Sequence, residues 1–143
     1  MNRPADALEL LTDQHDAIEH LLEELITVPQ EARAREFGKL ADLLTTHLAV
    51  EQDLFYPSIA VPAKPEILAE HDQIKRLVAD LLWRELDDSE LPRLTDLTAL
   101  VRRHITEQEA LFMAVADAMP TGILRGMGAE LRAQTESSLC ITG

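Results

Sequence analysis

The chain has 143 residues, of which 46% are hydrophobic and only 3% aromatic, so it can bury one aliphatic core. Its 26 acidic and 13 basic residues give a net charge of −13, which makes nucleic acid and anionic membranes poor partners. A single cysteine excludes an internal disulfide framework. Because neither a signal-like segment nor a long uncharged apolar stretch occurs, we expect a cytoplasmic protein without membrane contact.

Helix-forming residues dominate, and no alternating strand pattern occurs, which predicts an all-α fold. Apolar residues at steps of three and four predict four long helices, at about 4–27, 31–56, 65–86 and 90–118. A shorter fifth helix is predicted at about 121–136. Short links between the long helices predict an up-down-up-down antiparallel four-helix bundle. We therefore assign 1–143 to a single domain, with the bundle at about 4–119 and a C-terminal extension at 120–143.

The two halves of the chain repeat a histidine pattern. His15 and His71 each begin a His-Asp-x-Ile segment, and His47 and His104 each begin a segment that ends in Leu-Phe. Each of the four falls on the apolar side of a different predicted helix, where an unsatisfied imidazole atom costs about 1–3 kcal/mol. Convergence on a metal ion satisfies all four at once. The fifth histidine, His20, lies about 140° round its helix from His15 and is expected at the surface.

A carboxylate accompanies one of these histidines. Glu51 follows His47 by four residues, so both side chains lie on one helix face among leucines. A buried carboxylate needs compensation, which a metal ion supplies. Imidazole and carboxylate ligands suit iron, manganese or zinc rather than a metal that prefers thiolates. The order His-x-x-x-Glu, with a histidine on every helix, differs from the Glu-x-x-His pairs of ferritin-like di-iron proteins.

On these residues the sequence resembles the hemerythrin-like, or HHE cation-binding, domains. The resemblance runs from His15 to about Phe112 and rests on the four histidines, on Glu51, and on the Leu-Phe-Tyr-Pro run that begins at Leu54. It implies a non-heme iron centre in a four-helix bundle, with two irons joined by an oxo or hydroxo bridge. It also implies an open site for a small ligand such as O2, NO or peroxide. A single metal ion stays an alternative, and the chain is expected to be a monomer or a homodimer.

Two positions depart from the family pattern. The second His-x-x-x-Glu would end in a carboxylate at position 108, where this chain has Gln108. Oxygen-carrying hemerythrins have a further histidine four residues after the position of His71, and this chain has Lys75 there. An amide oxygen can coordinate a metal, but it bridges two irons poorly and offsets no charge.

The expected metal ligands combine the repeat with these departures. The set is His15, His47, Glu51, His71 and His104, with Glu107 or Gln108 contested. Glu19, four residues after His15, and Tyr56 are alternatives for the missing ligands. Tyr56 lies nine residues after His47, nearly opposite on a regular helix, so a phenolate ligand there needs a distortion near Pro57.

This ligand set leaves metal positions open, as binding or redox chemistry with O2, NO or peroxide requires. Binding or sensing is the preferred function, because no second catalytic group is evident beyond the ligands. One alternative is a di-iron redox enzyme that acts on peroxide or nitric oxide. The other is a metal-free helical interaction module.

Overall fold

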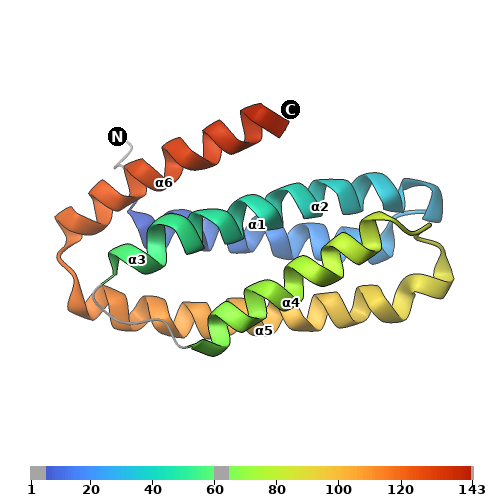
Figure 1. The fold of residues 1–143 in the computed structure, drawn as a ribbon, viewed down its shortest axis with the longest axis horizontal. Helices are drawn as coiled ribbons and strands as arrows, with labels where there is room; N and C mark the ends of the chain where they lie inside the picture. Colours follow the sequence, from blue (N-terminus) through green and yellow to red (C-terminus); the bar gives the residue numbers. More distant parts are fainter. Residues whose placement is uncertain (1–5, 60–64, 143) are drawn as a thin grey trace.

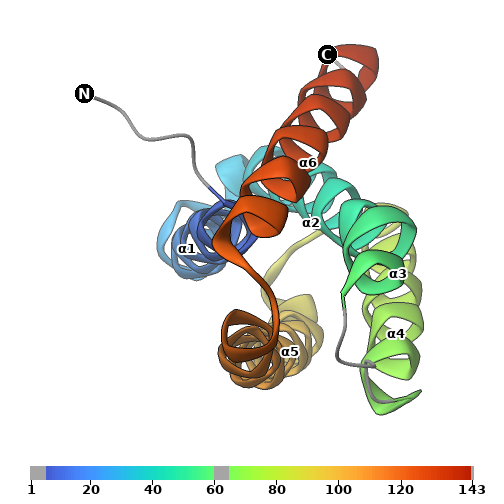
Figure 2. The same ribbon diagram turned by 90° about the vertical axis from the view of Figure 1, so that its left-hand side faces the viewer.

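The computed structural model describes residues 6–59 and 65–142, with side chains as far as residue 137. This part of the chain contains helices and no strands. Four long helices form an antiparallel bundle in which consecutive helices lie side by side (Figures 1 and 2). They are α1 (Ala7–Thr27), α2 (Gln30–Val50), α4 (Pro65–Leu82) and α5 (Leu91–Ala118). The predicted all-α four-helix bundle is confirmed.

The C-terminal end of α2 differs from the single α-helix that the sequence predicts. Glu51–Phe55 forms a π-helical turn, η1, and the short helix α3 (Tyr56–Ser58) follows it. The backbone N–H of Tyr56 donates to the carbonyl of Glu51, five residues earlier. A π turn inserts one residue into a helix, and each residue accounts for about 100° of rotation. The wide turn therefore moves Tyr56 away from the outward position of a regular helix.

Helix α4 ends at Leu82, earlier than the predicted end near Leu86. The chain turns back toward the core, where the carbonyl of Leu86 accepts a 3.0 Å hydrogen bond from the buried guanidinium of Arg33. The side chain of Asp87 then caps the 3-10 turn η2 (Asp88–Glu90). The helix thus ends before its apolar pattern ends.

The C-terminal extension is longer than the predicted helix. Helix α6 (Thr121–Thr142) lies obliquely against α1 and α2, and its far end projects from the bundle (Figures 1 and 2). Its residues Leu124, Met127 and Leu131 are buried in an apolar cluster that includes residues of α1, α2 and α5. The extension is thus part of the core at this end of the molecule.

The interior consists of two apolar clusters with a polar layer between them. One cluster, toward the turn between α1 and α2, contains Phe37 and fourteen other buried residues, and the second contains Phe55 and Phe112. On α1, His15 falls between Leu11 of the second cluster and Ile18 of the first. The polar layer lies at this level of the bundle. No helix in the described ranges is long and apolar enough to cross a membrane.

Candidate metal centre

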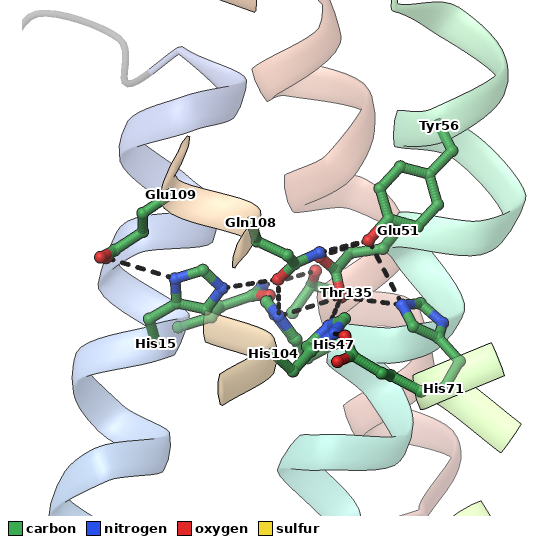
Figure 3. Close-up of polar contacts among 11 residues, drawn as sticks. His15, His47, Glu51, Tyr56, His71, His104, Gln108, Glu109 and Thr135 are labelled. Atoms are coloured by element: carbon green, nitrogen blue, oxygen red, sulfur yellow. Dashed lines mark hydrogen bonds and ion pairs between the residues drawn. The ribbon is translucent and has the colours of Figure 1, made fainter. Parts of the chain in front are cut away.

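The four histidines of the repeat converge on Glu51 in the middle of the bundle (Figure 3). Oε1 of Glu51 lies 3.1 Å from Nε2 of His47, 3.7 Å from Nε2 of His71 and 3.6 Å from Nε2 of His104. Each of the five side chains belongs to a residue that is at most 2% exposed. One side chain from each long helix, together with this carboxylate, therefore forms a compact buried layer.

These residues form two groups that share Glu51. We call the group of His15, His47 and Glu51 site A, and the group of Glu51, His71 and His104 site B. Within each site the candidate ligand atoms lie within 4.8 Å of one another. Each site thus offers two imidazoles and one carboxylate within the space that a single metal ion can bridge.

Gln108 is fully buried and belongs to the same layer. Its Oε1 lies 2.9 Å from Nε2 of His15 and 3.4 Å from Nε2 of His47. Its amide nitrogen donates to the hydroxyl of Tyr56, so the amide oxygen must face the histidines. Gln108 therefore places a neutral oxygen at site A and connects it to the side chain that borders site B.

Tyr56 borders site B because of the π turn. Its hydroxyl oxygen lies 3.3 Å from Nε2 of His71 and 3.5 Å from Oε2 of Glu51 (Figure 3). Burial, and next the negative charge of Glu51, raise the pKa of the Tyr56 hydroxyl far above its ordinary value. Tyr56 is therefore a neutral phenol that can donate a hydrogen bond inside the layer. A regular helix through Phe55 would have turned it outward.

Three of the histidines have an oxygen atom beside their outer ring nitrogen, Nδ1. The pairs are His47 with Gln14 at 2.6 Å, His104 with Glu70 at 3.4 Å, and His15 with Glu109 at 3.5 Å. For His47 and His104, an acceptor at Nδ1 requires a proton there, so Nε2 would be the atom that binds a metal ion. Nε2 of His15 instead donates to the amide oxygen of Gln108. Nδ1 of His71 has no hydrogen-bond partner in the described part of the chain, and Nδ1 of His15 has only the ion-pair distance to Glu109.

These outer partners are not predicted from the sequence, although each is adjacent in sequence to a residue of the layer. Gln14 precedes His15, and Glu70 precedes His71. Each nevertheless contacts the histidine of a neighbouring helix. A polar residue next to a candidate ligand is the signal that the sequence offers. Which histidine that polar residue contacts depends on how the helices pack.

The charges in the layer suit metal binding. Burial alone would raise the pKa of Glu51, but His47 and His104 hold it far below its ordinary range. Burial lowers the pKa of His71 to about 4, and burial together with His47 lowers that of His15. Near neutral pH the layer therefore holds an anionic carboxylate with neutral imidazoles at His15 and His71, the forms that bind metal ions.

Two buried atoms without hydrogen-bond partners also indicate that the donor set suits a cation. Oε1 of Glu51 and Nε2 of His104 are buried without a hydrogen-bond partner among the described residues. Each such atom costs about 1–3 kcal/mol when it is left unsatisfied. A cation among the Nε2 atoms and the carboxylate would satisfy both. Nitrogen and oxygen ligands without thiolate suit iron, manganese or zinc.

Comparison with known protein families identifies the domain. A model of the hemerythrin HHE cation-binding domain matches residues 6–116. The chain belongs to this family. The matched HHE domain contains both sites, whereas α6 lies outside it. No curated protein and no solved structure matches the chain.

Two of the candidate ligands lie outside the layer of this HHE domain. Glu19 forms a 2.5 Å ion pair with Arg102 at the surface. Glu107 lines a surface groove between α4 and α5, where a hydrogen bond with Glu70 raises its pKa. Lys75 is also exposed. Of the contested pair, Gln108 is therefore the residue that the fold brings to the histidines.

Proposed function

We propose that this protein binds two iron ions, one in site A and one in site B, and that the open metal positions take a small ligand such as O2, NO or peroxide. The observation that carries the proposal is the position of Glu51, which belongs to both groups of candidate ligands. Helix-bundle proteins build carboxylate-bridged two-metal centres from inward side chains of this kind. Membership of the cation-binding family supports the same conclusion.

The ligand count supports an open centre. Each site offers two histidines and one carboxylate, a donor set that leaves positions free at non-heme Fe(II). The neutral oxygens of Gln108 and Tyr56 border sites A and B without adding negative charge. Free positions are what an exogenous diatomic molecule or peroxide needs in order to reach the metal.

Iron, when bound, would supply the redox chemistry and the point of attachment for the small ligand. The chain itself prepares the site in three ways. It holds Glu51 as an anion, it keeps the phenol of Tyr56 protonated as a donor, and it encloses the layer between two apolar clusters. Binding or sensing is the function that this arrangement supports best, because the described residues contribute no free acid or base to the layer beyond the candidate ligands and Tyr56.

Metal analysis of protein from iron-fed cells, combined with an absorption spectrum in air, tests the proposal. We expect about two irons per chain and a near-ultraviolet charge-transfer band, both lost in Glu51→Gln. Glu36→Gln is the matched control, because Glu36, on α2, is also a buried carboxylate but contacts Lys39 instead of the histidines. Metal-free protein, or protein with one zinc per chain from iron-rich medium, would contradict the proposed two-iron centre. Peroxide turnover that disappears in His47→Ala would assign the redox enzyme instead.

A further inference from the structure

Helix α6 reaches the polar layer through a chain of side chains. Oγ1 of Thr135, on α6, lies 3.3 Å from Nε2 of Gln14 on α1. Oε1 of Gln14 lies 2.6 Å from Nδ1 of His47 on α2 (Figure 3 shows Thr135 beside the layer). A segment outside the matched HHE domain thus contacts, through one intervening residue, a candidate ligand of site A.

The direction of each hydrogen bond follows from Thr135. Its hydroxyl has one hydrogen, which it donates to the carbonyl of Leu131 at 2.8 Å. The hydroxyl oxygen can therefore only accept from Gln14, so the amide NH2 faces α6 and the amide oxygen faces His47. Nδ1 of His47 must then be the donor. Its Nε2 faces Oε1 of Glu51 at 3.1 Å, an acceptor that competes for the ring proton in the metal-free protein.

We propose that Thr135 and Gln14 are positioning residues through which α6 fixes His47 with its proton on Nδ1, so that the docking of α6 completes site A. The inference rests on the proposed metal function, because a metal ion can bind Nε2 only when that atom carries no proton. Outer hydrogen bonds of this kind fix the tautomer and the ring orientation of a metal-binding histidine.

The packing of α6 places the polar chain where it can act. Leu124, Met127 and Leu131 fix the first half of the helix in the same apolar cluster as Leu11. Leu131 also supplies the carbonyl that accepts the hydrogen bond from Thr135. Apolar docking and orientation of the hydroxyl therefore occur on consecutive turns of one helix.

The dependence on α6 is confined to one site. The outer partners of His104 and His15 are Glu70 and Glu109, which lie on the bundle helices α4 and α5. Site B has no described hydrogen bond to α6. Loosening α6 should therefore weaken site A and leave site B unchanged.

The first experiment reads the tautomer directly, by 15N NMR of the imidazoles in metal-free protein. We expect Nδ1 of His47 to carry a proton in the wild type, whether or not Nε2 carries a second one toward Glu51. Thr135→Val should lower the proton population on Nδ1, because Gln14 can then rotate its amide while Glu51 still attracts a proton to Nε2. Thr135→Ser should restore the wild-type signal. Gln14→Leu should cause the same loss from the other side. A His47 signal that does not change in Thr135→Val and Gln14→Leu would overturn the inference.

Thr98→Val is the matched control. Thr98 on α5 donates to the carbonyl of Leu94 at 2.9 Å, the same bond over the same four residues, and it is equally half-buried. Its hydroxyl has no described contact with the layer. An equal change of the His47 signal in Thr98→Val would show that only general helix stability is involved, and would also overturn the inference.

The second experiment titrates the metal-free protein with Fe2+ in the absence of oxygen. We expect two binding steps in the wild type, of which one weakens by about tenfold in Thr135→Val while the other is unchanged. Equal weakening of both steps, or of neither, would contradict the coupling of α6 to site A. If the wild type binds no metal, the proposed function fails, whereas the tautomer measurement still decides whether α6 positions His47.

Discussion

Glu70 on α4 accepts a hydrogen bond from Nδ1 of His104 on α5, although its neighbour in sequence is His71. Oε1 of Glu70 lies 3.4 Å from Nδ1 of His104, and both residues are at least nine-tenths buried. The opposite carboxylate oxygen of Glu70 accepts from Arg103 at 3.1 Å, so the acid is held from two directions. One helix therefore supplies a candidate ligand to the metal centre and, with the preceding residue, orients the candidate ligand of the next helix.

Removing this acceptor should weaken site B. Glu70→Ala leaves Nδ1 of His104 without its acceptor. The ring can then reorient, so that the lone pair of Nε2 no longer points toward the centre. We expect the affinity of one metal step to fall by about tenfold in an Fe2+ titration, with the other step unchanged. Glu66→Ala is the control, because Glu66 lies one turn earlier in the same groove and is exposed. Equal losses in the two variants would assign the effect to the charge of the groove.

Tyr56→Phe separates the hydroxyl from the ring. The hydroxyl contacts Glu51 and His71 but is neutral, so the variant should still hold its metal. Loss of one donor should weaken NO binding to the loaded protein by about three- to tenfold, the value of one hydrogen bond. A spectroscopic NO titration measures this, with iron content as the internal control. If Tyr56→Phe loses iron and a visible charge-transfer band, the phenol is itself a ligand.

Gln108→Glu introduces a second carboxylate at site A. Its oxygen lies near His15 and His47, so iron occupancy should rise. The metal-free variant should lose about 3 kcal/mol of stability, because a further buried charge faces Glu51 without compensation. Chemical unfolding with and without metal measures both effects. The exposed change Gln52→Glu should alter neither quantity. A variant whose stability and metal content match the wild type would show that residue 108 does not reach the metal.

The metal-free protein should lose stability in acid. Burial lowers the pKa of His71 to about 4 in the folded state, against an ordinary value of 6.5. The unfolded chain therefore binds more protons between these values, so the free energy of unfolding rises with pH across this window, by about 3 kcal/mol at most. Glu51, with its lowered pKa, acts in the same direction at lower pH. Above pH 6.5 the raised pKa of His104 acts in the opposite direction.

Urea unfolding of metal-free protein at several pH values between 4 and 6.5 measures this dependence. His71→Asn removes the titrating ring, so its stability should vary less over the same range. The control is His20→Asn, because His20 is exposed and pairs with Glu24 on the surface. A slope that is equal in the wild type and in His71→Asn would contradict the role of His71.

The sequence predicts the position of the histidines and of Glu51 because these depend only on helical period. His15, His47, His71 and His104 lie on the apolar stripes of four regular helices, so their inward direction follows from spacing. The end of α4 was less predictable, since the bond from Arg33 to the carbonyl of Leu86 joins segments far apart in the chain.

The surroundings of the centre could not be predicted for the same reason. Gln14 and Glu70 act on helices other than their own, so their role depends on how neighbouring helices pack. Thr135 contacts Gln14 from α6, and no pattern in the sequence predicts the direction in which this helix packs. Helical period identifies which side chains face inward, but it does not identify the partners that they meet.

Because of the π turn at Glu51–Phe55, the groups that face the metal centre depend on the length of this turn as well as on the residue types in it. Glu51 directly follows the regular helix α2, whereas the position of Tyr56 depends on the one extra residue between them. Deletion of a single residue from this turn would keep both side chains in the sequence and yet rotate the phenol by about 100°, away from His71. Two relatives with identical ligands could therefore differ in whether a hydroxyl faces the small molecule, and a single-residue insertion or deletion would be the mutation that separates them.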